Sequence, residues 1–262
     1  MSAAEDIYHW IKASPQLQEE SITDRLLYEM ARQSTQITHF QHKRFDEARH
    51  GADWDWWIDS PRQKYAFRVQ AKRMRPGHNH RGDILRQNQN GRQIDLLIAS
   101  SGALNLYPIY ALYGLPSGTS PCIRNHRLES VFVSPAPDVL SLAQGTPGTA
   151  IMDADLQSIA LPMPCLFCCP LSLNGPSPGP IGVLDAYFGR YRPPQPPAVR
   201  PLLKTFTDDL DDDRSIGYHE RLPAIVRELI EMEPGSEDAD RAFDVYREQF
   251  AGTSGLLICR VE

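Results

Sequence analysis

The stretch from Gly51 to Arg73, GADWDWWIDSPRQKYAFRVQAKR, constrains the fold of this chain more than any other. Its first part begins with alternating polar and apolar residues, so Asp53 and Asp55 share one face of a predicted strand. Ser60-Pro61 then interrupts the run, as turn residues do. The stretch therefore predicts a strand, a turn and a second strand.

The second predicted strand runs from Tyr65 to Lys72. It places Phe67, Val69 and Ala71 on one face and Arg68, Gln70 and Lys72 on the other. An acidic residue on the first strand thus faces an amide and an ammonium group on its neighbour. Such a group of side chains can hold a hard divalent cation together with a phosphate oxygen.

The flanking sequence predicts helices and strands in the order helix, strand, strand, strand, helix, strand. Ser21 is the expected N-cap of the first of these helices, with Asp24 three residues later. We expect helices at 3–13, 21–33, the second half of 81–100, 136–142, 222–232 and 237–250, and strands at 36–45, 53–58, 65–72, 104–113, 128–134 and 255–261.

The length permits one large domain or two small ones, since 262 residues with 41% hydrophobic side chains can bury a core. We expect a core over residues 1–115 and an extension over 116–262 that packs on it, in one continuous domain. The proline-rich stretch 162–201 is expected to be a long loop that wraps the core, without regular helix or central strand.

Charge is unevenly distributed along the chain. The net charge of -6 shows that the molecule is not basic overall. Residues 61–92 are nevertheless basic, because they contain nine lysines and arginines and a single acidic residue, Asp83. A second run, Asp208 to Asp213, is strongly acidic. Both runs can be solvated loops, or the basic run can be a binding surface beside the two strands.

Cysteine usage and the chain's hydropathy indicate the compartment. The five cysteines are an odd number, no signal-peptide pattern opens the sequence, and no apolar run approaches a membrane span. We therefore expect a soluble, cytoplasmic protein with free thiols and no membrane partner.

These motifs resemble a known superfamily. Gly51-Ala52-Asp53, followed seventeen positions after Asp53 by Gln70-Ala71-Lys72-Arg73, resembles the PD-(D/E)XK nucleases and is most similar to the Mrr-type members with Q-x-K. The likeness covers residues 17–113. The stretch also resembles an uncharacterised bacterial family built around GADWDWW and VQAKR. The resemblance implies an α/β, restriction-endonuclease-like core and a Mg²⁺- or Mn²⁺-dependent endonuclease that hydrolyses DNA, with bacterial antiphage defence as the expected role by fold-level analogy.

The resemblance also implies roles for individual residues. Asp53, Gln70 and the main-chain carbonyl of Ala71 are the implied metal ligands. Lys72 is implied to orient the attacking water or to stabilise charge on the phosphate. Because Gln70 stands where other members carry an acid, a further carboxylate is needed. Glu20 is preferred as catalytic residue and ligand, while Glu29, Glu47 and Asp55 remain open.

The basic run supplies the expected DNA contacts, which we assign to phosphate binding without sequence specificity. The arginines in question are Arg62, Arg68, Arg73 and Arg75. Two other readings remain: a catalytically silent nuclease fold that binds DNA or protein, and an effector activated by a second messenger or partner. The second half of the chain could carry such a site or a homo-oligomer interface.

Three further groups of residues have a structural and a functional reading. The tryptophans Trp54, Trp56 and Trp57 are expected to pack in the core rather than to stack on bases. The C-x-x-C spacing of Cys165 and Cys168 fits buried thiols better than zinc. His78-Asn79-His80 is expected to lie in a mobile surface loop, although it could touch phosphate or a metal.

Overall fold

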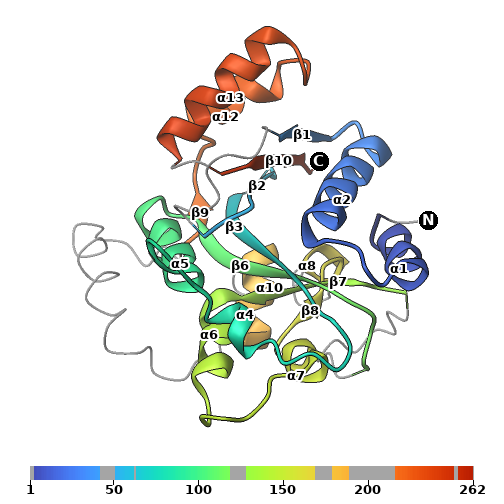
Figure 1. Cartoon of the computed structure of the whole chain (residues 1–262). Coiled ribbons are helices and arrows are strands. Elements are labelled where there is room, and N and C mark those ends of the chain that lie inside the picture. Colours follow the sequence, from blue (N-terminus) through green and yellow to red (C-terminus); the bar gives the residue numbers. More distant parts are fainter. Residues whose placement is uncertain are drawn as a thin grey trace.

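The two strands predicted between Gly51 and Arg73 form the middle of a mixed sheet in the computed structural model (Figure 1), which describes residues 3–41, 51–61, 63–118, 128–168, 179–188, 216–250 and 253–261. Strand β2 (Trp54–Asp59) and strand β3 (Lys64–Arg73) pair antiparallel, with Asp55 opposite Arg68. The chain is thus a mixed α/β protein with a central mixed sheet.

The sheet joins strands from both halves of the chain. Its order is β1-β10-β2-β3-β6-β7-β8, and β9 pairs with the first residues of β3. Strand β10 lies between β1 and β2, antiparallel to β1 and parallel to β2. The bounds of the remaining strands in this sheet are β1 Ile37–Gln41, β6 Tyr107–Tyr113, β7 Val131–Pro135, β8 Leu161–Pro162, β9 Tyr218–His219 and β10 Gly255–Arg260.

The alternation in β2 and β3 separates two buried faces. Trp54 and Trp56 pack with Phe67 and Val69 on one face, whereas Trp57 contributes to the core on the other. All three tryptophans are buried, which confirms that they are core residues. Because helices cover both faces of the sheet, odd- and even-numbered residues of β2 and β3 are both buried, as in the central strands of layered α/β proteins.

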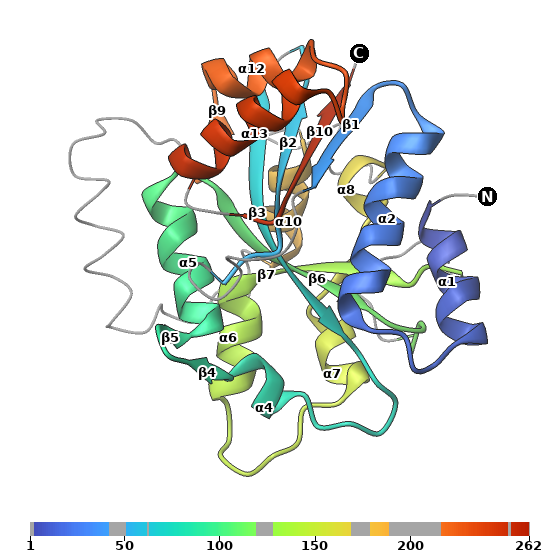
Figure 2. The same cartoon turned by 45° about the horizontal axis from the view of Figure 1, so that its top comes forward.

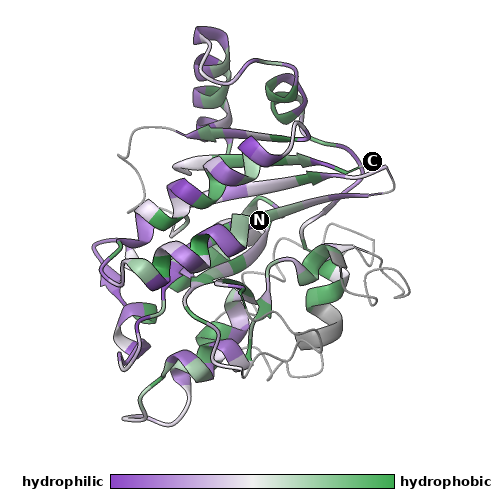
Figure 3. Cartoon of the chain, turned by 90° about the vertical axis from the view of Figure 1, so that its right-hand side faces the viewer, coloured by the Kyte–Doolittle hydropathy of each residue, from purple (hydrophilic) through white to green (hydrophobic). Residues whose placement is uncertain are grey.

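Helices cover both faces (Figure 2). Helices α1 (Ala3–Ala13) and α2 (Glu19–Gln33) pack on the face that carries Trp54 and Trp56. The opposite face is covered by α5 (Gln93–Ala103), α6 (Ala136–Gln144), α12 (Ala224–Ile230) and α13 (Glu237–Gln249). The helices that face the viewer in Figure 3 alternate between hydrophilic and hydrophobic residues, as expected where one side of a helix meets the core.

Smaller elements complete the described residues. They are α4 (Arg81–Ile84), the β4–β5 hairpin (Gln87–Asn88 and Gly91–Arg92), α7 (Asp153–Ser158), α8 (Cys165–Cys168) and α10 (Pro180–Phe188). The β4–β5 hairpin directly precedes α5.

Two expectations about element boundaries were wrong. Helix α2 begins at Glu19 with Gln18 at the N-cap, so Ser21 lies inside the first turn and does not cap it. The proline-rich stretch is not entirely loop, because α10 begins at Pro180. Proline at the first position of a helix loses no hydrogen bond, since that N–H has no partner within the helix. The remaining part of the predicted strand 36–45 beyond Gln41 lies outside the described residues.

Candidate metal centre

A cavity of about 130 Å³ opens where the start of α2 meets the end of β3. Its walls come from segments that are far apart in the sequence, including α2, β3, α5 and the start of β10. Polar side chains dominate the lining, which consists of Glu19, Glu20, Thr23, Asp24, Leu27, Gln41, Asp53, Gln70, Ala71, Lys72, Arg86, Gln93, Ser254 and Gly255. The cavity therefore gathers the residues that the resemblance implies for a metal centre.

Asp53 is placed at the start of β2 by its main chain. Its N–H donates to the Val69 carbonyl at 2.8 Å, which continues the β2–β3 ladder. Its Oδ2 accepts hydrogen bonds from the Ala71 N–H at 2.5 Å and from Nε2 of Gln70 at 2.7 Å. The carboxylate is thereby fixed beside the two residues that the sequence places seventeen and eighteen positions later.

Gln70 is held by bonds at both ends of its amide. Nε2 donates to Asp53 and to the Ala71 carbonyl at 3.1 Å, and Oε1 accepts from Nε2 of Gln93 at 2.8 Å. The amide nitrogen thus lies between two oxygen acceptors. Rotation of the amide by half a turn would direct Oε1 toward the same oxygens, and three oxygen donors would then converge.

Lys72 and Glu19 form the other side of the centre. Nζ of Lys72 lies 3.5 Å from Oε1 of Glu19, and both side chains are mostly buried. Oε2 of Glu19 accepts the Arg73 N–H at 2.7 Å. Burial raises the pKa of Glu19, and the Lys72 ammonium and the Arg73 N–H act against this rise. The pair keeps a carboxylate and an ammonium within one cavity.

The structure distinguishes among the candidates for the additional carboxylate of the metal centre. Glu20 lines the cavity, but it is exposed, whereas Glu19 contacts Lys72 and the β3 main chain. Glu29 is buried elsewhere on α2 and binds Arg25 and Arg32. Glu47 lies outside the described residues. Because α2 begins at Glu19, the side chain of Glu19 points into the cavity, where the sequence had led us to expect Glu20. The sequence reasoning did not consider Glu19.

Asp55 does not line the cavity. Both its oxygens bind Arg68, with Nε at 2.8 Å and Nη2 at 2.9 Å. Tyr246 of α13 donates to Asp55 Oδ2 at 2.8 Å and accepts from Trp57 Nε1 at 3.0 Å. Arg68 also donates to the Phe250 carbonyl. Asp55, one of the open candidates for the further acid, is therefore the partner of Arg68 instead.

Two of the arginines that we expected to contact DNA are buried. Arg68 is 0% exposed and internally paired, so it is wrong as a phosphate contact. Arg73 is 6% exposed, and its Nη1 donates to the Tyr113 carbonyl at 3.2 Å, so its guanidinium is also directed inward. Arg75 is exposed, and Arg62 lies outside the described residues. The basic run is therefore partly structural.

Arg86 and Gln93 are cavity residues that the sequence reasoning missed. Arg86 is exposed at the rim, and Gln93 binds Gln70 from the first turn of α5. Ser254 and Gly255 come from the start of β10. The helix predicted in the second half of residues 81–100 includes Gln93 and was the sequence feature that could have indicated its position. No local sequence pattern indicates that residue 254 lies near residue 70.

The other sequence candidates lie apart from the cavity. Cys165 is buried in the core, which agrees with the structural reading. The side chains of Cys168 and Cys169, and the whole acidic run 208–213, lie outside what the structure describes. His80 is 3% exposed and hydrogen-bonded, so the expected surface loop does not describe that residue, whereas Asn79 is exposed and His78 is partly exposed.

The fold and the cavity together define a mixed α/β protein with a polar cavity lined by carboxylates, amides and a lysine. A family model matches residues 1–252, and the chain therefore belongs to that family, which is described as a family of unknown function (DUF6615). No match was found among curated proteins or among solved structures. Within the described segments, no helix has the length and apolar character needed to cross a membrane.

Proposed function

We propose that this protein is a Mg²⁺-dependent endonuclease that hydrolyses DNA phosphodiester bonds, with a core of the restriction-endonuclease type. The observation that carries the proposal is the convergence of Asp53, Gln70, the Ala71 carbonyl and Lys72 with Glu19 in one cavity. The resemblance to PD-(D/E)XK nucleases implies a role for each of these groups except Glu19. A role in bacterial antiphage defence follows only by analogy with related folds.

The order of elements supports the same core. Helix α2 is followed by β1, β2 and β3, then by α5 and by β6, which runs parallel to β3. The insertion of β10 between β1 and β2 is an addition that the resemblance does not predict.

The donor groups fit a hard divalent cation. Asp53 and Glu19 offer carboxylate oxygens, Ala71 offers a carbonyl oxygen, and Gln70 offers Oε1 once its amide is rotated. Mg²⁺ and Mn²⁺ prefer such oxygen donors. When bound, the ion polarises the phosphate and lowers the pKa of a coordinated water.

The protein's own groups supply the remaining chemistry. The Lys72 ammonium lies at the cavity wall, where it can orient a water or stabilise the negative charge that develops on a phosphate. Glu19 fixes the position of that ammonium through its 3.5 Å contact. Arg75 and Arg86 are exposed cations from which salt-sensitive phosphate contacts can be made.

A catalytically silent fold that binds DNA or protein is the second candidate. The observation that favours it is the Gln70 amide, whose nitrogen donates to Asp53 and Ala71 and so satisfies acceptors that a cation would otherwise use. Titration calorimetry separates the two. An active centre, or an effector that awaits an activator, binds Mg²⁺ or Mn²⁺ in a manner abolished by Asp53→Asn, whereas a silent fold does not.

Cleavage of supercoiled plasmid in the presence of Mg²⁺ or Mn²⁺ tests the proposal directly. We expect Lys72→Ala and Asp53→Asn to lower the rate by at least two orders of magnitude, in the range seen when charge-stabilising groups are removed. Lys64→Ala is the matched control, because Lys64 lies at the other end of β3 and binds Asp59. Cleavage that persists in both cavity variants would reject the proposed centre.

A further inference from the structure

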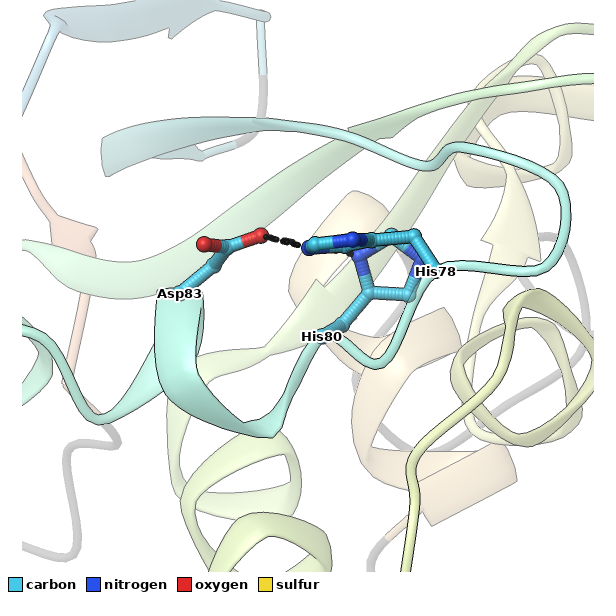
Figure 4. A group of neighbouring side chains, drawn as sticks. All are labelled: His78, His80 and Asp83. Carbon is cyan, nitrogen blue, oxygen red and sulfur yellow. Dashed lines mark hydrogen bonds and ion pairs between the residues drawn. The ribbon is translucent and has the colours of Figure 1, made fainter.

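Two histidines and a carboxylate meet in the segment that leads from β3 into α4, outside the cavity (Figure 4). Nε2 of His78 lies 2.8 Å from Oδ2 of Asp83, and Nδ1 of His80 lies 4.0 Å from the same oxygen. The three ligand atoms all lie within 4.8 Å of one another. Imidazole nitrogens combined with a carboxylate are the donors that Zn²⁺ and related ions use in proteins.

A fourth residue orients the buried histidine. Oδ1 of Asp153, in the first turn of α7, lies 2.6 Å from Nε2 of His80. A carboxylate at this distance favours the tautomer that carries its proton on Nε2, which leaves the lone pair of Nδ1 directed at Asp83 and His78. Metal-bound histidines in proteins commonly make this contact from their second nitrogen.

The main chain holds the segment in this form. The His80 N–H donates to the Ile151 carbonyl at 2.9 Å, and Oδ1 of Asn79 accepts from the N–H groups of Ile151 and Arg81 at 3.0 and 3.1 Å. Nη1 of Arg81 donates to the Ala143 carbonyl at 2.8 Å, near the end of α6. His80 is thus positioned by contacts that do not depend on an ion, as one ligand of a preorganised site should be.

We propose that His78 Nε2, His80 Nδ1 and the Asp83 carboxylate bind a transition-metal ion of the Zn²⁺ class, with Asp153 as positioning residue. Tetrahedral ligands at zinc distances lie about 3.3 Å apart, so the 2.8 Å contact between His78 and Asp83 has to open by roughly 0.5 Å and the 4.0 Å separation of His80 from Asp83 has to close by roughly 0.7 Å. The ion would replace the hydrogen bond between His78 Nε2 and Asp83 Oδ2. His78 and Asp83 are 41% and 46% exposed, so the ion can enter from solvent.

This site is independent of the proposed nuclease centre. It has two nitrogen donors, whereas the cavity around Asp53 offers oxygen donors that suit Mg²⁺. An ion here would clip the β3–α4 loop to α4, two residues before Arg86 at the cavity rim. It would therefore fix the segment between the end of β3 and Arg86, both of which border the cavity.

Titration of the full chain with Co²⁺, followed by the visible absorption of tetrahedral Co²⁺, tests the inference. All titrations contain excess Mg²⁺ and are repeated in an Asp53→Asn background, so that the cavity does not contribute. We expect one equivalent to bind and Zn²⁺ to displace it. His78→Ala and Asp83→Asn alter partly exposed side chains and should each weaken binding at least tenfold.

Asp153→Asn should weaken binding by about 10- to 100-fold, as outer-shell partners of metal-bound histidines do. His9→Ala is the matched control, because His9 is an exposed histidine on α1. Thermal unfolding of each variant without metal verifies that it is folded. The proposal is overturned if the wild-type chain gives no tetrahedral Co²⁺ spectrum, or if His78→Ala and Asp83→Asn bind Co²⁺ as tightly as the wild type.

Discussion

In the proposed metal centre, Gln70 would control how readily the cavity accepts a cation, because its amide can present either a nitrogen or an oxygen to Asp53. In the described conformation the nitrogen faces Asp53 and the Ala71 carbonyl. Metal binding requires the opposite orientation, and Gln93 must then turn its own amide to continue the hydrogen bond. The two glutamines are therefore coupled, and Gln93 belongs to the site through its hydrogen bond to Gln70.

The variant Gln70→Glu tests this coupling. A carboxylate at position 70 adds charge to the ligand set and removes the competing donor, so we expect the affinity for Mg²⁺ to rise roughly tenfold, or about 1.4 kcal/mol. Without metal the midpoint of thermal unfolding should fall, because two carboxylates then face each other. Titration calorimetry measures the first effect and calorimetric unfolding the second.

Gln41→Glu is the control for charge alone. Gln41 lines the same cavity and donates to Asp24 at 2.5 Å. An equal gain in Mg²⁺ affinity from this variant would show that net charge, rather than the position of Gln70, governs binding.

The pair of Asp55 and Arg68 shows what a buried charge does in this fold. Both side chains are 0% exposed, and their bidentate contact is completed by Tyr246 from α13. Loss of one member of a buried pair leaves an uncompensated charge or an unsatisfied polar group. The network thus ties α13 to the strands that carry Asp53 and Gln70.

Tyr246→Phe isolates the neutral member of this network. The change removes the donor to Asp55 and leaves Trp57 Nε1 without its acceptor, both in the interior. We expect the free energy of unfolding to fall by about 2 kcal/mol, measured by urea denaturation. Tyr28→Phe, on the exposed side of α2, should change it by less than about 0.5 kcal/mol. Equal effects would contradict the role of the buried hydroxyl.

Sequence reasoning reached the residues of the site unevenly. The meeting of Asp53, Gln70 and Lys72 could be predicted, because two-residue alternation determines which side chains share a face and the resemblance supplied the spacing and the implied roles. Glu19 could not, since a shift of one residue at a helix start rotates a side chain by about 100°. Arg68 illustrates the opposite case: its charge suggested an exposed contact, whereas its partner Asp55 is fixed by the cross-strand register.

At the scale of elements, Gly51 sets the distance between the start of β2 and α5. Its φ is +71°, and a Cβ there would lie 2.9 Å from the Leu97 main-chain nitrogen. Glycine adopts this backbone region without a steric penalty. The G-x-D spacing thus lets α5 approach closely enough for Gln93 to reach Gln70.

Gly51→Ala should therefore lower stability through both strain and crowding. We expect a loss of about 3 kcal/mol, from the left-handed backbone and from the clash with α5. Two controls divide the effect: Gly77 has φ +76° with open space around it, and Gly82 has open space and no positive φ. Gly77→Ala should cost about 1 kcal/mol and Gly82→Ala close to none. Similar losses in all three would contradict the contact with α5.

Elements with strong local signals were predicted with nearly correct bounds. Helix α1 lies at Ala3–Ala13 and α13 at Glu237–Gln249, close to the expected ranges. The errors fell where local signals mislead. Gln18 is not a residue type that indicates an N-cap, and a proline that opens a helix looks the same in sequence as a proline that ends one.

At the scale of the whole molecule, the position of β10 was beyond prediction. The strand itself was expected, but its pairing with β1 and β2 joins residues about two hundred positions apart. Periodicity reveals which residues are buried and not which strand lies beside them. The expected division into a core over residues 1–115 and an extension over 116–262 therefore leaves β7, β8, β9 and β10 outside the core, although all four belong to its sheet and β10 lies between β1 and β2.

Removal of residues 251–262 should abolish cooperative folding. Leu256, Leu257 and Ile258 are fully or nearly fully buried, and without them β1 loses its neighbour in the sheet. Circular dichroism during heating should show no sigmoidal transition. A chain that lacks only residues 261 and 262 is the control and should unfold cooperatively. A sharp transition at the wild-type temperature in the shorter chain would contradict a central role for β10.

The place of β10 also bears on the order in which the protein becomes complete during synthesis. The ribosome makes β1, β2 and β3 within the first 73 residues, but the strand that separates β1 from β2 ends only at Arg260. Ser254 and Gly255, which line the cavity, emerge with it. Until then a nascent chain has Asp53, Gln70 and Lys72 but lacks one wall of the cavity, so any activity of this centre is withheld until translation has passed that point.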